Sequence, residues 1–419
     1  MVSAAELITA PPGKGPLLGP DLDRPQLIAD ASVACVDGRI AAVGKTADVL
    51  ARYPEKEAVR VLDASGRLVA PGFVDCHTHL PFAGTREMEF DARSRGETYE
   101  AIAAKGGGIR ASVRLTHATS ESDLTAAVSR RLATLLAQGT TTVEAKSGYG
   151  LSLAEERKQL RAATRAGAAS PVEVIPTFLG AHEVPDEYRS RRAEYVTLLC
   201  SEMIPAVARE GLARFCDVFC DRGVFTVEES RAILECGKAH GLVPKLHADE
   251  LADVGAAALA AELGAVSADH LLHANDAGLG AMLKAGTVAV LLPGTAFTLG
   301  LPYARGRDMI SMGLPVALAT DWNPGSTMSS SMPLAMTLAV TQMRLSPAEA
   351  WMAATANAAA AVSAGDRLGR IAPGLEADLC LFDTPDHRHV AYHYGHEHVR
   401  AVIKGGRLAW ERSDSSICS

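Results

Sequence analysis

The chain has 419 residues, of which 48% are hydrophobic and 21% charged, so it can bury a large core and general disorder is excluded. The formal net charge of −8 is spread along the chain, and no Lys/Arg cluster could follow a phosphate backbone, which argues against nucleic acid as a partner. The apolar stretches are shorter than a membrane span and the N-terminus lacks a secretory layout, so we expect a cytoplasmic protein with no membrane partner.

Short strands with Gly and Asp turns are expected in residues 27–68 and again in 366–412. Neither segment alone makes a stable sheet. We therefore expect both chain ends to combine into a small β-sandwich domain, with residues 1–68 as its N-terminal part and 366–419 as its C-terminal part.

Residues 69–365, between these ends, alternate short β-branched runs with longer amphipathic segments, which is typical of repeated βα units and a parallel sheet. Eight such units close naturally into a (β/α)8 barrel of the TIM type, so the expected fold class is α/β. The eight runs are LVAPGFVDCH, TTVEAKS, VEVIPTFLG, FCDVFCD, VPKLHAD, VSADHL, TVAVLLPG and PVALATDW.

Three predicted helix starts support this interpretation, because each has Ser or Thr followed three residues later by Glu, the offset of a capping box. Pro347 occupies a first helical position, where its missing N–H costs nothing. The three pairs are Ser152 with Glu155, Thr226 with Glu229, and Ser346 with Glu349.

Eight cysteines are scattered along the chain without the dense spacing of a disulfide scaffold, so we expect reduced thiols. The close pair Cys216 and Cys220 has no second pair to complete a zinc site. Packing within a strand is therefore favoured over metal binding.

Polar residues fall at the ends of four predicted strands, where the reactive groups of a (β/α)8 barrel stand. His77 and His79 end the first strand, and their spacing lets both rings point the same way and bind one ion. An HxH pair alone is weak evidence, but His247 and Asp321 end the fifth and eighth strands, and His270 ends the sixth. Three neutral imidazoles and one carboxylate suit zinc or iron better than magnesium or calcium.

Several segments match a family pattern. PGFVDCHTHLPFAGTR, followed downstream by HADE, ADH and ATDWNPGS, resembles the amidohydrolase superfamily. The blocks GETYEAIAAKGGGI, VEAKSGYGL, TFLGAHEVP and LLPGTAF look specifically like the imidazolonepropionase family, and KSGYG and GGGI are far more specific than HxH. The resemblance covers roughly residues 28–408.

This resemblance implies a metal-dependent hydrolase that opens the ring amide of 4-imidazolone-5-propanoate to N-formimidoyl-L-glutamate in histidine degradation. It implies one divalent ion, zinc or iron, held by His77, His79, His247 and Asp321. Binuclear relatives use a carboxylated lysine at the end of the fourth strand, and FCDVFCD supplies none. A small-molecule substrate and a homodimer are expected from the same resemblance.

Three residues are candidates for the proton chemistry. Asp321 can bind the ion and touch its water, and we hypothesise that His270 hydrogen-bonds the oxyanion as it forms. Glu250 follows His247 by three residues, just beyond the strand end, where a carboxylate can reach the substrate ring nitrogens and move a proton. The alternative for Glu250 is a salt bridge or a charge at a helix N-terminus.

Arg86, in the loop PFAGTR, can pair bidentately with the propionate carboxylate, although most arginines only solvate a surface. By resemblance, other residues also contact the substrate or product. Each has a structural alternative, since Gly148 and Gly150 can simply shape a turn and Tyr99 can pack in a helix. The expected contacts besides Glu250 are Tyr99, Tyr149, His182 and the turn Asn323-Pro324-Gly325-Ser326.

Other polar residues near strand ends have simpler interpretations. His273 is expected to pack behind the site, and Lys146 and Lys245 to compensate charge within the barrel. The run HRHVAYHYGHEH has five histidines between residues 387 and 398 but no regular ligand spacing. We therefore place no metal ion there.

Two other functions remain open at this point. An amidohydrolase-type deaminase of a heterocyclic ring can share HxH, HxxE and the final aspartate, but it would release ammonia. A catalytically silent scaffold would be expected to lose ligands, and all four are present.

Overall fold

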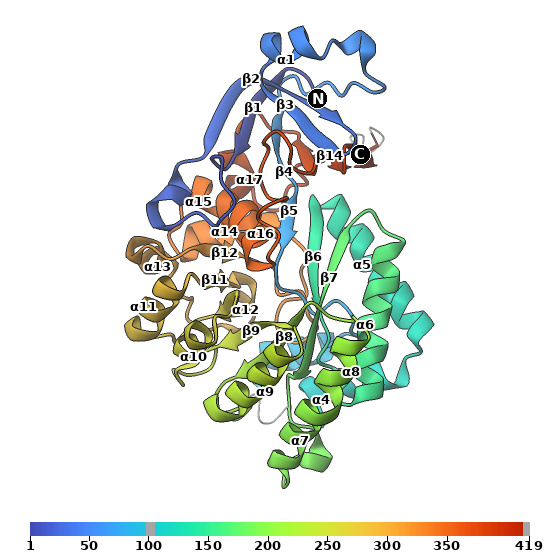
Figure 1. The fold of residues 1–419 in the computed structure, drawn as a ribbon, viewed down its shortest axis with the longest axis vertical. Helices are drawn as coiled ribbons and strands as arrows, with labels where there is room; N and C mark the ends of the chain where they lie inside the picture. Colours follow the sequence, from blue (N-terminus) through green and yellow to red (C-terminus); the bar gives the residue numbers. More distant parts are fainter. Residues whose placement is uncertain (98–104, 414–419) are drawn as a thin grey trace.

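The computed structural model describes residues 1–97 and 105–413. Two sheets organise it, one of eight parallel strands and one mixed sheet of seven strands (Figure 1). In Figure 1 the mixed sheet lies at the top with both chain termini beside it, and the parallel sheet with its helices lies below. The predicted barrel with an additional β domain is thus confirmed.

The parallel strands lie side by side in chain order, one from each predicted run. Beyond the ends of the first and last strands, the amide of Asp321 donates to the carbonyl of His77 (3.0 Å) and that of His79 donates to Trp322 (3.1 Å), which brings these two ends together. The strands are β5 (Phe73–Asp75), β6 (Thr140–Lys146), β7 (Glu173–Ala181), β8 (Phe215–Cys220), β9 (Val243–Ala248), β10 (Ser267–His270), β11 (Val288–Leu291) and β12 (Val316–Leu318).

Helices follow the barrel strands and pack outside them (Figure 1). Their apolar faces, such as Leu124, Val128 and Leu132, are fully buried, which is what fixes an amphipathic helix to a sheet. The helices are α2 (Glu87–Ser94), α4 (Ile109–Ala118), α5 (Glu121–Ala137), α6 (Leu153–Ala168), α7 (Arg192–Leu198), α8 (Ile204–Arg209), α9 (Val227–Ala239), α10 (Ala256–Leu263), α11 (Asp276–Ala285), α12 (Pro293–Leu299), α13 (Gly306–Met312), α14 (Met332–Gln342), α15 (Pro347–Met352) and α16 (Ala358–Ala361).

Two of the three predicted capping boxes are present. Thr226 caps α9 and Ser346 caps α15, each with reciprocal bonds to its Glu. The third prediction is wrong, because Ser152 precedes α6 but its side chain makes no capping bond. Glu155 pairs instead with Lys158, 2.5 Å away.

The first predicted run, LVAPGFVDCH, divides between the two sheets. Its first part, β4 (Leu68–Pro71), pairs with strands of the mixed sheet, and β5 starts the barrel at Phe73. Gly72 stands between them, and a Cβ at this position would lie 2.3 Å from the side chain of Thr141. Only glycine fits where the chain passes from one sheet to the other.

The mixed sheet draws on both chain ends, in the order β15-β14-β13-β4-β1-β2-β3. β1, which was not predicted from the sequence, pairs with β2 and β4 near the middle of the sheet. The strands besides β4 are β1 (Ala4–Thr9), β2 (Gln26–Val36), β3 (Arg39–Lys45), β13 (Leu379–Phe382), β14 (Val399–Lys404) and β15 (Arg407–Glu411).

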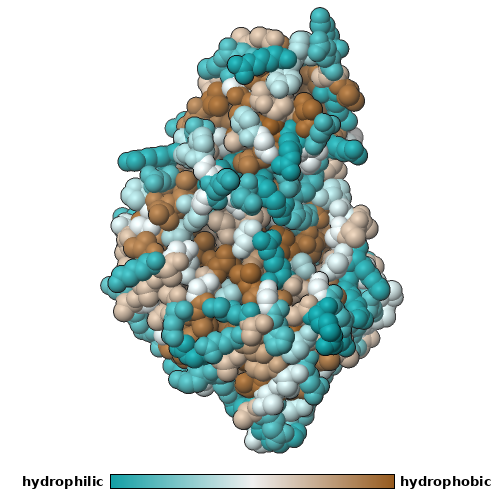
Figure 2. Space-filling view, viewed as in Figure 1, coloured by the Kyte–Doolittle hydropathy of each residue, from teal (hydrophilic) through white to brown (hydrophobic). Residues whose placement is uncertain are grey.

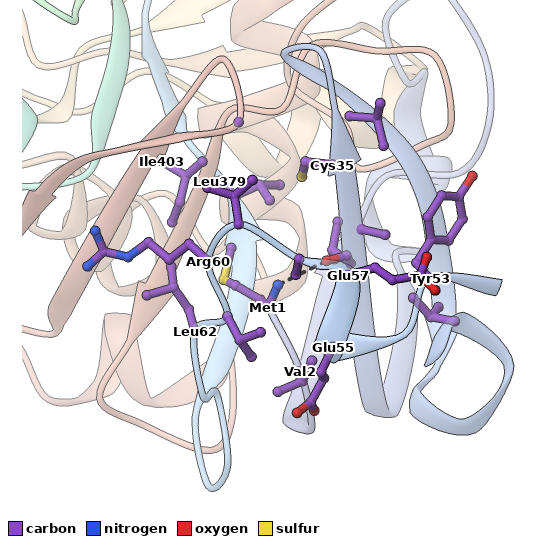
Figure 3. A pocket seen from close by; sticks show the side chains of 18 of the residues that line it. Met1, Val2, Cys35, Tyr53, Glu55, Glu57, Arg60, Leu62, Leu379 and Ile403 are labelled. Atoms are coloured by element: carbon purple, nitrogen blue, oxygen red, sulfur yellow. Dashed lines mark hydrogen bonds between the residues drawn. The ribbon is translucent and has the colours of Figure 1, made fainter. Parts of the chain in front are cut away.

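A cavity of about 650 Å³ lies in this β domain, between strands from both chain ends (Figure 3). Met1, Cys35, Tyr53, Leu379 and Ile403 are among the residues that line it. The lining contains no candidate catalytic or metal-binding residue, so the chemistry must be sought in the barrel.

The outer surface in Figure 2 carries polar side chains over much of the visible face, with hydrophobic patches between them. Within residues 1–97 and 105–413, no helix has the length and apolar character needed to cross a membrane.

Candidate metal centre and active site

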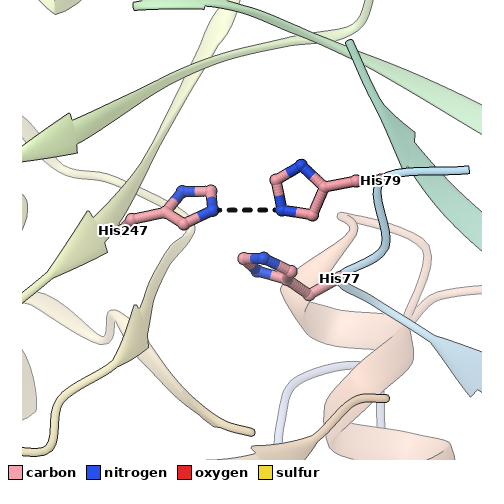
Figure 4. A group of neighbouring side chains, drawn as sticks. All are labelled: His77, His79 and His247. Carbon is pink, nitrogen blue, oxygen red and sulfur yellow. Dashed lines mark hydrogen bonds between the residues drawn. The ribbon is translucent and has the colours of Figure 1, made fainter. Parts of the chain in front are cut away.

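Three histidines converge at the carboxyl ends of β5 and β9 (Figure 4). The donor nitrogens of His77, His79 and His247 all lie within 4.8 Å of one another. The Nε2 atoms of His79 and His247 are 3.4 Å apart, and the ring of His77 lies beside both. All three side chains are buried, so this arrangement can surround a single ion.

Asp321 brings a carboxylate to the same point from the end of β12. Its Oδ1 lies 3.5 Å from His77 Nε2 and 3.6 Å from His79 Nε2. Its Oδ2 accepts hydrogen bonds from Thr295 Oγ1 (2.5 Å) and Ser326 Oγ (3.0 Å). The two hydroxyls hold the carboxylate so that Oδ1 faces the histidines.

Two donor atoms of this centre have no hydrogen-bond partner in the described part of the chain. Among the described residues, His77 Nε2 and Asp321 Oδ1 are buried without any hydrogen bond. Leaving such an atom unpaired costs about 1–3 kcal/mol, so two of them aimed at one point indicate a site for a cation. Burial lowers the pKa values of His77 and His79 well below the ordinary value, so both rings are neutral and can offer lone pairs. The four residues therefore fit a divalent ion.

Two buried carboxylates support the outer edges of the histidines. His77 Nδ1 is 2.6 Å from Asp269 Oδ2, and His247 Nδ1 is 3.1 Å from Asp217 Oδ2. The hydrogen bond between His77 Nδ1 and Asp269 leaves the lone pair of His77 Nε2 free to face the metal, whereas among the described residues His247 Nδ1 lies beside Asp217 without a hydrogen bond. The sequence analysis missed both aspartates, although an acidic residue inside the apolar run FCDVFC is a signal that could have revealed Asp217.

A second set of donor atoms, which shares one histidine with the first, includes Glu144 and Asp269. An ammonium already lies there, because Lys146 Nζ is 3.0 Å from Glu144 Oε1, 2.7 Å from Asp217 Oδ2 and 3.5 Å from Asp269 Oδ2. Lys245 Nζ is 3.1 Å from Glu144 Oε2. These contacts agree with charge compensation by the two lysines.

Glu250 and His270 face each other at the ends of β9 and β10. Glu250 Oε2 lies 3.5 Å from His270 Nε2. Asp221 holds the loop after β9, accepting hydrogen bonds from the amide of Glu250 (2.7 Å) and the next two amides. Burial, with the charges of Asp321 and Asp221, raises the pKa of Glu250 well above its ordinary value. A carboxyl group in this condition is suited to moving a proton near neutral pH.

Tyr149 and His182 form an aromatic wall beside the centre. The His182 ring stacks on that of His79, with centroids 5.0 Å apart and 22° between the planes, and Tyr149 lies 5.4 Å from His182. Burial and the neighbouring His247 lower the pKa of His182 to about 3. His182 therefore presents a neutral ring, with its Nδ1 3.0 Å from the carbonyl of Gly148.

The KSGYG loop is held by a carboxylate that the sequence analysis missed. Glu156 accepts hydrogen bonds from the amides of Gly148 (3.1 Å), Gly150 (2.8 Å) and Leu151 (2.7 Å). Gly148 has a φ of 108°, and a Cβ there would lie 2.9 Å from His182 Nδ1. These two glycines thus shape a turn, which positions Tyr149 between them.

Arg86 lies beside the turn Asn323–Ser326 but already has an acidic partner. Its Nε and Nη2 donate to Glu89 Oε2 at 2.9 and 2.6 Å. Its Nη1 faces Gly325, where a Cβ would come within 2.7 Å. Asn323 Oδ1 accepts hydrogen bonds from the amides of Gly325 (2.7 Å) and Ser326 (2.9 Å), so the guanidinium and the turn form one wall.

The remaining predictions have different outcomes. His273 is exposed, so its expected packing behind the site is wrong. Tyr99 lies outside the described residues. Cys216 and Cys220 are buried free thiols of β8, as the packing interpretation predicts.

In the C-terminal run, the ring of His393 lies near three further histidine rings, and within the described chain these rings form no group of donor atoms with the spacing for an ion. His387, in the same run, does lie in such a group with Glu6 and Asp386, but its Nδ1 is already 2.8 Å from Glu6 Oε1.

Comparisons with known proteins agree with this site. The model of the amidohydrolase family matches residues 68–409, and that of the bacterial imidazolonepropionase-like composite domain matches residues 33–55. The chain is 53% identical over 410 residues to the imidazolonepropionase of Symbiobacterium thermophilum, covering 97% of this chain and 96% of that protein. It is 49% identical over 407 residues to the imidazolonepropionase of Geobacillus thermodenitrificans, with the same coverage.

Among solved structures, the fold is similar to that of E. coli guanine deaminase, with a TM-score of 0.70 and 16% identity. The match covers 98% of this chain and 99% of the deaminase. At this identity the likeness concerns the fold alone.

Proposed function

The chain belongs to the amidohydrolase family and, within it, to the imidazolonepropionases, and we propose that its buried donor cluster is where the ring of 4-imidazolone-5-propanoate is opened. Hydrolysis of the ring amide gives N-formimidoyl-L-glutamate, a step of histidine degradation. The observation that carries this proposal is the convergence of three imidazoles and one unpaired carboxylate oxygen on a single point.

We propose that His77, His79, His247 and Asp321 hold one divalent ion. Nitrogen ligands with a single carboxylate favour zinc or iron over magnesium or calcium. When bound, such an ion lowers the pKa of a coordinated water toward neutrality and so supplies a nucleophile for the amide.

The proton steps are assigned to Glu250 and His270. Glu250 takes a proton from the attacking water and delivers it to the ring nitrogen as the C–N bond breaks, a role that its raised pKa supports. His270, 3.5 Å from this carboxyl group, donates a hydrogen bond to the carbonyl oxygen as negative charge develops there. Asp321, with Oδ1 directed at the centre, would border the same water.

The wall of Arg86 and the turn Asn323–Ser326 is assigned to the propionate end of the substrate. The guanidinium supplies the positive charge that the carboxylate needs, while Tyr149 and His182 border the ring on the other side. Glu89 keeps Arg86 oriented before substrate arrives.

The direct test follows the disappearance of imidazolone propanoate by ultraviolet absorbance, before and after chelation. Chelation should abolish turnover, and adding zinc or iron should restore it. Formimidoyl-glutamate should accumulate without release of ammonia. Undiminished turnover in fully metal-free protein would contradict the metal assignment, and ammonia as a product would favour the deaminase alternative.

Replacing Arg86 by Ala is expected to raise KM by about 10- to 100-fold with a smaller effect on kcat, because a charge-assisted hydrogen bond to the substrate contributes about 1.5–3 kcal/mol. Steady-state kinetics measures this change. Arg95→Ala is the matched control, since Arg95 is exposed and its guanidinium pairs with Asp91. An unchanged KM in Arg86→Ala would remove Arg86 from the substrate site.

A further inference from the structure

We propose that Lys146 is a positioning residue of the metal centre, whose single ammonium holds both carboxylates that orient the ligand histidines His77 and His247. The inference rests on the proposed function for the identity of the ligands. It adds a cationic support that contacts the aspartates behind these histidines.

Two series of contacts start from Lys146 Nζ, and each passes through one aspartate to one ligand histidine. Lys146 Nζ lies 2.7 Å from Asp217 Oδ2 and 3.5 Å from Asp269 Oδ2. The same Asp217 oxygen lies 3.1 Å from His247 Nδ1, and the same Asp269 oxygen lies 2.6 Å from His77 Nδ1. One ammonium at the end of β6 thus supports a ligand on β9 and another just beyond the end of β5.

The charges explain why a lysine is needed at this point. Asp217, Asp269 and Glu144 have no exposed side-chain surface, and neither do Lys146 and Lys245. Buried carboxylates repel one another, and an ammonium placed between them offsets this repulsion and keeps each carboxylate beside the Nδ1 atom of its histidine. Lys146 is the lysine that contacts both histidine-bound aspartates.

Lys245 provides an internal comparison, because it has the same charge and the same burial. Its ammonium pairs with Glu144 (3.1 Å) and donates to the carbonyls of Cys76 (3.1 Å) and Ala361 (3.4 Å). Glu144 contacts both lysines, so the two lysines differ in their contacts with the aspartates and not in their contact with Glu144. Loss of Lys245 should therefore leave Asp217 and Asp269 in contact with the ammonium of Lys146.

The test measures the zinc affinity of the metal-free full-length protein by competition with a chromophoric chelator. Lys146→Met is expected to weaken zinc binding by about 10- to 100-fold, the usual effect of losing an outer partner of a metal ligand. The zinc affinity of Lys245→Met is expected to stay within about twofold of that of the unmodified protein. Equal affinity in Lys146→Met and the unmodified protein, or equal losses in both variants, would overturn the proposal.

A charge-balanced variant covers the case in which Lys146→Met does not fold. Glu144→Gln/Lys146→Met removes one cation and one anion, and Glu144→Gln alone is its reference. The double variant should unfold thermally close to the reference yet bind zinc about tenfold more weakly. If it binds zinc as tightly as the reference, or fails to fold where the reference folds, Lys146 is only a structural residue.

The affinity readout also separates this inference from the proposed function. Tight zinc binding by the unmodified protein, with no turnover of imidazolone propanoate, would contradict the proposed reaction while the lysine comparison still stands. Absence of zinc binding in the unmodified protein would overturn both.

Discussion

Glu250→Gln is expected to lower kcat by about 10²- to 10⁴-fold, the usual contribution of a group that transfers protons in the transition state, while the protein keeps its metal. The amide has nearly the size of the carboxyl group but cannot take up and release the proton. Glu250 also lies outside the four proposed ligands, so metal binding should persist. Steady-state kinetics and metal analysis of the same purified sample measure the two effects.

Glu262→Gln is the matched control for this change, because Glu262 is exposed on α10 and pairs with Arg231. It should retain ordinary turnover. A Glu250→Gln enzyme with normal kcat would assign the proton steps elsewhere, and one that lost its metal would indicate that Glu250 supports the ligands instead.

Asp321→Ala should have a different effect, because it removes the proposed ligand oxygen and the group proposed to border the attacking water. Zinc affinity and kcat should each fall by more than about 100-fold, since even an outer partner of a ligand often accounts for about 10- to 100-fold. Chelator competition and the ultraviolet assay measure these quantities. Asp308→Ala, at an exposed position of α13, is the control.

The pair of variants separates two roles that share one pocket. Glu250→Gln should lose turnover and keep its metal, whereas Asp321→Ala should lose both turnover and tight metal binding. If Asp321→Ala binds zinc as tightly as the unmodified protein, the ligand set proposed here is wrong.

The barrel could be predicted because each of its strands is a short local pattern, and parallel strands bring their carboxyl ends to one edge. His77, His79, His247 and Asp321 could therefore be placed near one another without knowing any distance. That prediction rested on the spacing of His77 and His79 just beyond β5 and on the positions of His247 and Asp321 at the ends of other strands.

The buried lysine and aspartates that support the histidines could not be predicted in the same way, because their contacts join residues that are far apart in the sequence. Lys146 and Asp217 are 71 residues apart, and His77 and Asp269 are 192 residues apart. Nothing near these residues in the sequence records which partner the fold supplies. The division of LVAPGFVDCH at Gly72 was missed for a related reason, because both halves have the same apolar character and only pairing with the chain ends separates them.

The position of β4 has a consequence for how the enzyme matures. In the mixed sheet β4 lies between β1 and β13, and β13 is translated more than three hundred residues after β4. While the nascent chain is still on the ribosome, the segment that leads through Gly72 into the HxH strand thus lacks one of its two neighbours. Its final alignment must wait for the last part of the polypeptide to emerge, so uptake of the ion is expected to follow translation rather than accompany it.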